Sequence, residues 1–401
     1  MTTTATRADH RPWAVFLIFL RLGLTSFGGP VAHLGYFREE FVTRRQWLSD
    51  RSYADLVALC QFLPGPASSQ VGIALGFSRA GYSGAFAAWA GFTLPSAIAL
   101  ILFAIGISSV GNSFSSGALQ GLKIVAVAVV AQAVWGMARS LCTDTKRITI
   151  MMLATCAVLL MPSVWSQVGV IVVAGLAGIV LFKPAQLVPH DPLPIQISRR
   201  TGAFWLALFL IVLIALPLAS EVLPNQTLAI IDAFYRAGSL VFGGGHVVLP
   251  LLQTEVVPTG WVDEQVFLAG YGATQAMPGP LFTFAAFLGA SMSGTPSGWA
   301  GGLIALVAIF IPSFLLVVGA LPFWEQLRQN LRTQAALSGI NASVVGLLLA
   351  ALYQPVWTSA ILSAQDFGLA LVAFVALMFW KLPPWLVVIG GGVAGWLLNL
   401  L

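Results

Sequence analysis

Long apolar stretches separated by short polar loops run along most of the chain, and this pattern predicts a bundle of helices. Nine stretches are readily placed as helices, at residues 84–108, 117–138, 147–161, 164–182, 203–219, 297–319, 335–354, 366–380 and 384–400. Apolar runs of about 15–25 residues match helices that cross a bilayer, whereas a membrane β-barrel shows short alternating segments. The expected fold is therefore an all-α, polytopic membrane protein.

Four further apolar stretches contain glycine and proline near their middle, at residues 13–45, 53–78, 227–256 and 265–292. Proline removes a backbone donor and clashes with the preceding turn, and glycine adds backbone freedom, so these helices should be discontinuous. Each stretch either crosses the membrane once or dips into it and returns. Charge favours dips, because the arginine-rich 38–51 loop should face the cytoplasm and the acidic 246–264 loop should face outward.

An internal repeat divides the chain. Residues 19–23 and 27–30 reappear as 234–238 and 242–245, and Gln-Phe-Leu-Pro-Gly-Pro at 61–66 reappears as Gln-Ala-Met-Pro-Gly-Pro at 275–280. Two later matches follow in the same order, Pro95-Ser96 with Pro312-Ser313 and residues 121–123 with 339–341. Duplicated halves are common in secondary transporters. We expect a first half at 1–182, a polar linker with one extra helix at 183–226, and a second half at 227–401.

Composition excludes a soluble protein. Hydrophobic residues make up 58% of the 401 positions and charged residues only 8%, against about 25% charged residues in a soluble domain. A chain this apolar needs a bilayer as its solvent. We expect a multi-pass protein of the bacterial inner (plasma) membrane.

Basic residues predict how the two halves are oriented. They lie in four loops, which carry Arg139, Lys146 and Arg147; Lys183, Arg199 and Arg200; Arg328 and Arg332; and Lys381. All four loops can be cytoplasmic at once if helix 84–108 runs outward and its counterpart 297–319 runs inward. The expected topology is therefore inverted, and the extra helix at 203–219 makes the inversion possible.

The helix breaks are the candidate binding site. A helix that starts after Pro30, Pro66 or Pro280 presents free N–H groups and a partial positive charge, which suit an anion. The alternative is that the breaks are kinks that let helices pack closely. The candidate substrate-binding residues at the breaks are Gly28, Gly29, Pro30, Gln61, Pro64, Gly65, Pro66, Ser68, Ser69, Gly243, Gly244, Gln275, Pro278, Gly279, Pro280 and Thr283.

Two arginines occupy the same repeat position inside apolar helices. Arg21 and Arg236 each precede a glycine pair by a few residues. A charge there is costly and tends to face a cavity or a partner, and arginine suits a tetrahedral oxyanion. Snorkelling to the interface and an ion pair with Glu40 or Glu255 are the open alternatives.

Four other polar residues are weaker candidates. Lys123 lies near the start of helix 117–138 and lines the anion path or snorkels to the interface. Glu40, Glu255 and His246 are candidates for proton coupling, although Glu40 and Glu255 also fit solvated loop acids.

Several kinds of chemistry find no support in the chain. The three cysteines lack the spacing of a metal or redox site, and residues 243–245 lack the lysine of a phosphate-binding loop. We therefore expect no enzymatic activity, no cofactor, no metal and no nucleic acid. The expected partners are a small oxyanion and the lipid bilayer, and a homodimer is left open.

The duplicated motifs resemble those of the two-domain chromate ion transporter family. The resemblance rests on Phe-Gly-Gly-Pro at 27–30 with the following Glu39-Glu40, on Pro-Gly-Pro at 64–66, and on weaker second copies at 242–244 and 278–280. It runs through residues 13–182 and 227–400. It implies a secondary transporter that exports chromate from the cytoplasm and confers chromate resistance, with sulfate as a competing analogue. Gly245 replaces Pro30 in the second copy, so the halves need not contribute equally.

Two other functions remain open. One is a transporter for sulfate or another oxyanion, or a passive anion channel, with the same architecture. The other is a membrane-embedded enzyme that reduces chromate, although neither the scattered cysteines nor the four histidines offer a redox centre.

Overall fold

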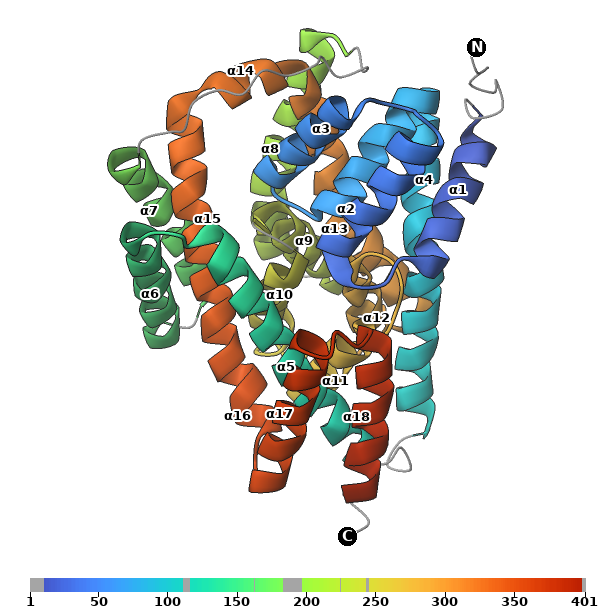
Figure 1. Ribbon diagram of the computed structural model, residues 1–401, viewed down its shortest axis with the longest axis vertical. Coiled ribbons are helices and arrows are strands. Elements are labelled where there is room, and N and C mark those ends of the chain that lie inside the picture. Colours follow the sequence, from blue (N-terminus) through green and yellow to red (C-terminus); the bar gives the residue numbers. More distant parts are fainter. Residues whose placement is uncertain are drawn as a thin grey trace.

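The protein is an all-helical bundle in a computed structural model that describes residues 11–110, 116–161, 163–182, 197–223, 225–242 and 245–398 (Figure 1). The nine predicted helices are confirmed. They are the second part of α4 (Ala67–Val110), α5 (Ser116–Leu141), α6 (Thr145–Leu160), α7 (Val164–Leu181), α8 (Arg199–Val222), α13 (Gly298–Ala320), α15 (Leu331–Ala351), α17 (Ala364–Met378) and α18 (Pro384–Leu398). The polar linker at 183–196 lies outside the described residues.

The four glycine- and proline-containing stretches are broken helices, as predicted. In the first half they form α1 (Pro12–Thr25) with α2 (Gly29–Arg38) and η2 (Glu39–Arg44), and α3 (Asp50–Phe62) with the first part of α4. In the second half they form α9 (Gln226–Leu240) with η4 (Gly245–Val247) and α10 (Val248–Val256), and α11 (Glu264–Thr274) with η5 (Leu281–Thr283) and α12 (Phe284–Ala290). The candidates Gly243 and Gly244 lie outside the described residues.

The two parts of a broken stretch lie side by side as a helical hairpin. Phe19 of α1 packs on Phe37 of α2 and Phe41 of η2, with ring centroids 5.6 and 5.1 Å apart. Phe267 of α11 packs on Phe284 of α12 in the same way, at 5.1 Å. Helices α3 and α4 and helices α9 and α10 also pack together, so each break is the tip of a hairpin, whereas the dip into the membrane stays a prediction.

Helix α4 is interrupted by a turn that its continuous apolar sequence does not predict. The backbone of Ala80 and Gly81 is not helical, and Gly81 has a φ of +58°. The segments on either side pack so closely that a methyl group on Gly76 would lie 2.3 Å from the carbonyl oxygen of Gly84. The turn leaves a short segment at residues 67–79 and a longer one at residues 82–110, and the longer one is long enough to cross a membrane.

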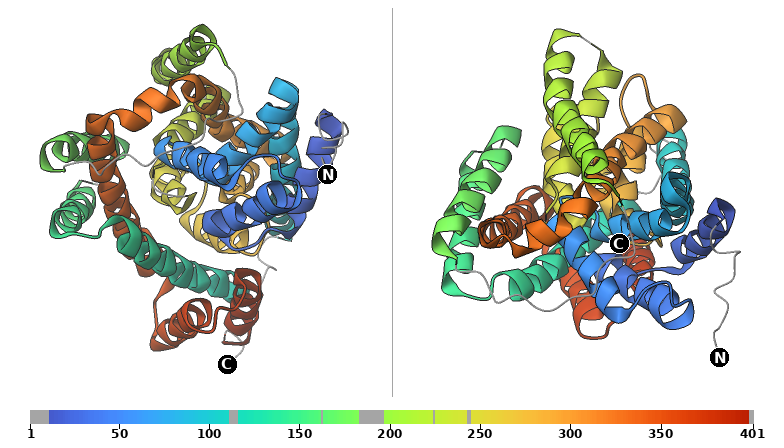
Figure 2. Two further views of the ribbon diagram at one scale, coloured as in Figure 1. Left: turned by 45° about the horizontal axis from the view of Figure 1, so that its top comes forward. Right: turned by 90° about the horizontal axis from the view of Figure 1, so that it is seen from above.

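Each half packs its last two helices against the other half. Helices α6 and α7 pack on α15, and α17 and α18 pack on α5, as both views of Figure 2 show. Glycines permit these contacts: a methyl group on Gly121 would lie 2.1 Å from the carbonyl oxygen of Gly391, and one on Gly339 would lie 2.0 Å from that of Ala174. Gly121 and Gly339 are repeat counterparts, so the exchange is symmetrical.

The outer surface suits a lipid environment. Five helical stretches are long and apolar enough to cross a membrane, at Ala67–Ile107, Gly117–Leu141, Arg199–Val222, Gly298–Phe323 and Leu331–Ala360. Helix α8 exposes Leu210, Ile211, Ile214 and Leu218. Exposed apolar surface of this extent is unfavourable in water and favourable against acyl chains. The short helices η6 (Leu321–Phe323), α14 (Trp324–Gln329), η7 (Leu352–Trp357) and α16 (Thr358–Ala360) connect the longer ones.

Candidate functional site

The hairpin tips of the two halves meet at the centre of the bundle. The backbone N–H of Gly279 donates to the carbonyl oxygen of Ser26 at 2.9 Å, and the N–H of Gly65 donates to that of Val241 at 2.7 Å. Ser26 and Val241 are repeat counterparts, as are Gly65 and Gly279. The two hydrogen bonds are thus equivalent: in one the second half donates to the first, and in the other the first half donates to the second. Together they join each tip to a tip of the other half.

Glycine is required at both contacts. Gly65 and Gly279 have φ angles of +123° and +98°, a conformation that other residues rarely adopt. A methyl group on Gly65 would lie 2.9 Å from the hydroxyl oxygen of Ser313, and one on Gly279 would lie 3.0 Å from that of Ser96. The serines of the repeated Pro-Ser pairs, Ser313 and Ser96, therefore pack against the tips at Gly65 and Gly279.

Two cavities lie on either side of this junction and share Gly28 and His246. The larger has a volume of about 560 Å³ and the smaller about 60 Å³. Both follow α5: Val129 and Gln132 line the small cavity, and the helix then lines the large one as far as Leu141. The large cavity thus extends toward the end of α5 that carries Arg139.

Both cavities carry a few polar groups among apolar ones, and no acidic residue of the described chain lines either of them. Gln61 and Asn341 line the large cavity, and Gln275, the counterpart of Gln61, lines the small one. The side-chain Nε2 of Gln275 is buried and has no hydrogen-bond partner in the described structure. Nδ1 of His246 lies 2.8 Å from the hydroxyl of Tyr271, which orients the ring between the cavities. The junction therefore offers donors to a small anion.

The arginines do not line either cavity. Arg21 pairs with the buried Glu40, and Arg236 pairs with Glu255 at 3.1 Å, so the two contacts are repeat counterparts. Arg236 also pairs with Asp232 at 2.9 Å. An ion pair with these glutamates is the alternative that the sequence left open, and it is the geometry observed. Each pair ties the two arms of a hairpin together.

The other predicted residues fall into two groups. Gly28, Gly29, Pro30, Gln61, Gly65, Gln275, Gly279 and His246 line a cavity, whereas Pro64, Pro66, Ser68, Ser69, Lys123, Pro278, Pro280, Thr283, Glu40 and Glu255 do not. The hydroxyl of Thr283 donates to the carbonyl oxygen of Pro280 at 2.8 Å, so it caps its own turn. Lys123 points to the carbonyl oxygen of Ser359 at 3.4 Å.

A family model decides the identity of the chain. It describes a chromate transporter and matches residues 13–179 and 228–396, the two halves of the repeat. The chain belongs to the chromate transporter family. The two matched segments coincide with the halves that the repeated motifs defined.

Curated members of the chromate transporter family are similar over nearly the whole chain. A "Probable chromate transport protein" of Synechococcus elongatus is 28% identical over 94% of this chain and 93% of its own length. A "Chromate transport protein" of Pseudomonas aeruginosa is 28% identical over 96% and 91%, and one of Cupriavidus metallidurans is 27% identical over 94% and 91%. No solved structure matches the chain. Family membership and the five apolar stretches identify a multi-pass membrane protein.

Sequence reasoning missed a group of buried polar residues in the first half of this chromate transporter family member. Ser26, His33 and Thr93 are at most 1% exposed, and each has a side-chain atom without a hydrogen-bond partner in the described structure. Their counterparts in the repeat are Val241, Val248 and Phe310. A position-by-position comparison of the halves is the signal that finds them. At these three positions the first half buries polar groups where the second half has apolar residues.

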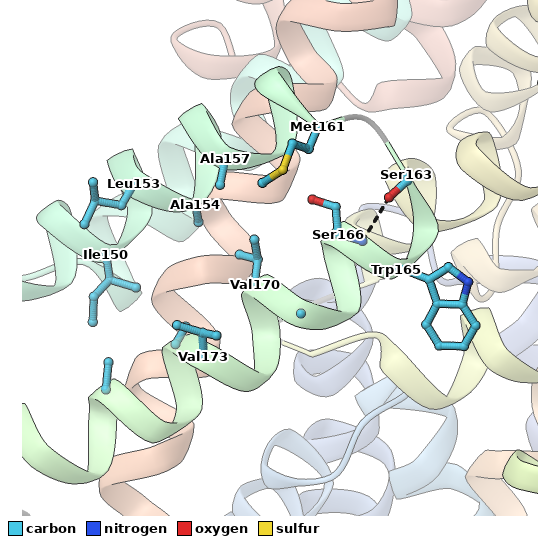
Figure 3. Close-up of a pocket in the computed structure, with 13 residues that line it drawn as sticks. Ile150, Leu153, Ala154, Ala157, Met161, Ser163, Trp165, Ser166, Val170 and Val173 are labelled. Carbon is cyan, nitrogen blue, oxygen red and sulfur yellow. Dashed lines mark hydrogen bonds between the residues drawn. The ribbon is translucent and has the colours of Figure 1, made fainter.

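A further cavity in the described part of the chain does not suit an oxyanion. It measures about 620 Å³ and lies between α6 and α7 (Figure 3). Aliphatic side chains such as Leu153, Val170 and Val173 line it, and the hydroxyl of Ser163 already accepts from the backbone N–H of Ser166 at 3.1 Å. An oxyanion would lose its hydration there without gaining donors.

Proposed function

We propose that this protein is a secondary transporter that exports chromate from the cytoplasm and confers chromate resistance. The observation that carries the proposal is the junction of four hairpin tips, beside two cavities that share Gly28 and His246 and contain the polar side chains of Gln61 and Gln275. Discontinuous helices that meet between related halves are where secondary transporters bind their substrates. Chromate is the proposed anion because relatives of this chain are named chromate transport proteins.

The chemistry of the junction favours an anion over a cation. Helix α2 begins at Gly29, so its unpaired N–H groups and positive dipole end lie beside both cavities. The amide donor of Gln275 adds a further group. We assign substrate binding to these groups, and we assign Arg21 and Arg236 to holding the hairpins in place.

An inverted arrangement of the halves in the inner membrane completes the proposal. It is supported by the directions of counterpart helices, because α5 runs upward and α15 downward in Figure 1. The large cavity then faces the cytoplasm, beside Arg139. A dianion that leaves a negative interior gains about 4–5 kcal/mol per 100 mV, since each charge contributes about 2.3 kcal/mol, so export needs no other energy source.

Inside-out membrane vesicles test this function. We expect labelled chromate to accumulate when the potential is positive inside the vesicle, and excess sulfate to compete if both tetrahedral dianions fit the junction. Vesicles that contain the inserted protein but accumulate no more chromate than vesicles without it would refute the proposal. Single-channel currents across a planar bilayer would instead identify a passive anion channel.

A charge placed in the small cavity should stop transport. Gln275→Glu replaces the unpartnered amide donor by a carboxylate that repels the dianion, and we expect chromate accumulation to fall by about tenfold or more. Gln326→Glu, which adds the same charge at an exposed position of α14, is the matched control and should transport normally. Equal activity of the two variants would place the anion path elsewhere.

A further inference from the structure

Helices α3 and α11 each begin with an acidic residue, and the surroundings of this residue differ between the two halves. Ser49 caps the start of α3 and Asp263 caps that of α11, each by accepting a backbone N–H. Asp50 and Glu264 follow these caps and are therefore counterparts. The repeat thus places one carboxylate at the first turn of each helix.

In the first half this carboxylate has a cationic partner. Arg38 donates to both carboxylate oxygens of Asp50, at 2.8 and 2.7 Å. These hydrogen bonds hold the pKa of Asp50 below its usual range. Arg38 lies two residues before Glu40, and Glu40 is the counterpart of Glu255. The residue that corresponds to Arg38 is therefore Gln253.

In the second half a glutamine replaces this arginine, and a cavity is present. Gln253 and Glu264 both line a cavity of about 290 Å³ between α7, α10, α11 and α15. Ser359, whose hydroxyl donates to Glu264, lines it too. This cavity shares no lining residue with the two cavities at the junction.

The other polar side chains that line this cavity are neutral and carry oxygen atoms. Gln167 is 2% exposed and its Oε1 has no hydrogen-bond partner in the described structure. Thr254 and Thr358 contribute hydroxyls, and the chain is not helical at Gln354, which frees backbone groups beside the cavity. Carboxylate, amide and hydroxyl oxygens are the ligands of hard cations, and unwound segments often bind coupling ions in transporters.

Three other charged groups face this region. Lys123 of α5 is close enough to interact electrostatically with Glu264, with Asp263 and with Asp366 of α17. The Lys123 ammonium contacts the carbonyl oxygen of Ser359, and it does not line the cavity. The two further carboxylates offset its charge, so the local balance favours an additional cation.

We propose that the cavity at Glu264 binds a small monovalent cation, Na⁺ or a proton, in the place that the Arg38 guanidinium occupies in the first half. Glu264 provides the charge, and Gln167, Ser359 and Thr254 provide neutral oxygens. In the inverted arrangement this cavity faces outward, so it loads from the external side. Resting on the proposed function, the site couples cation entry to chromate export.

Direct binding of radiolabelled ²²Na⁺ to the purified full-length protein tests the site without chromate. We expect saturable binding that Glu264→Gln and Gln253→Arg each weaken by about tenfold or more, the second because arginine would restore the first-half ion pair. Asp50→Asn is the matched control, because it removes the counterpart carboxylate, and it should bind normally. Glu264→Asp keeps the charge and should bind, which guards against a folding defect.

Proteoliposomes separate the two ions. Sodium binding lost in Glu264→Gln identifies Na⁺. Absence of sodium binding with proton uptake that accompanies chromate efflux and disappears in Glu264→Gln identifies the proton. Absence of both in the wild-type protein, or equal behaviour of Glu264→Gln and Asp50→Asn, overturns the proposal. Sodium binding without chromate transport would leave the cation site standing and remove chromate as the substrate.

Discussion

Replacing either Gly65 or Gly279 by alanine is expected to abolish chromate transport. Both residues have positive φ angles, which cost an alanine about 1–2 kcal/mol. The added methyl group at Gly65 would also lie 2.6 Å from the Nε2 of Gln70. Either the tip or the Gln70 side chain, whose Nε2 donates to the carbonyl oxygen of Pro64 at 2.7 Å, must shift to relieve this contact, and we expect the hydrogen bond from Gly65 to Val241 to be lost.

The two variants should fail to the same degree, because the contacts are repeat counterparts. Chromate accumulation in inside-out vesicles, normalised to inserted protein, measures the effect. Gly368→Ala is the control: it lies within α17, and a methyl group there meets no atom within 4 Å. Wild-type transport by Gly65→Ala or Gly279→Ala would show that the junction of the tips has no role in the transport path.

Replacing Arg236 by alanine is expected to destabilise the protein far more than replacing Arg21. Arg236 is the ion-pair partner of Asp232 and Glu255, whose side chains are 8% and 11% exposed. Its removal leaves two buried carboxylates together, at a cost of about 3–5 kcal/mol. Arg21→Ala should cost about 0–1 kcal/mol, because Glu40 keeps Arg44 and Arg45 as partners. Thermal unfolding of the purified variants measures the difference.

A neutral triple variant separates a clamp from a substrate contact at Arg236. Combining Arg236→Ala with Asp232→Asn and Glu255→Gln removes the unpaired charges and should restore most of the lost stability. If Arg236 only holds the hairpin, this variant should also recover chromate accumulation. A variant that is folded and inserted but inactive would instead return Arg236 to the anion path.

Much of the fold was predictable because its signals are local. Helix length follows from runs of apolar residues, and the breaks follow from the effect of glycine and proline on the backbone. The nine helices and the four discontinuities could therefore be placed. The turn at Gly81 could not, because a single glycine in an apolar run is common in membrane helices.

The candidate site was predictable only in part. Gln61, Gln275 and four glycines of the breaks were identified, and each of these lines a cavity: the glycines are Gly28, Gly29, Gly65 and Gly279. Arg21 and Arg236 drew attention because a charge in an apolar helix is costly, but cost alone does not distinguish a ligand from a counter-ion. His33 was missed because a buried histidine has no local signature.

By itself the sequence determined the class of the protein, its duplication, its helices and the positions of their breaks, since each depends on residues close together in the chain. The tertiary structure decided which tips meet, which helices the halves exchange and which carboxylates have an arginine. The first two features depend on contacts between residues far apart in the chain, such as Ser26 with Gly279 and Gly65 with Val241, and the third depends on how the two arms of each hairpin pack together. Such contacts are selected by the packing of the whole bundle, in which small residues must coincide on facing helices.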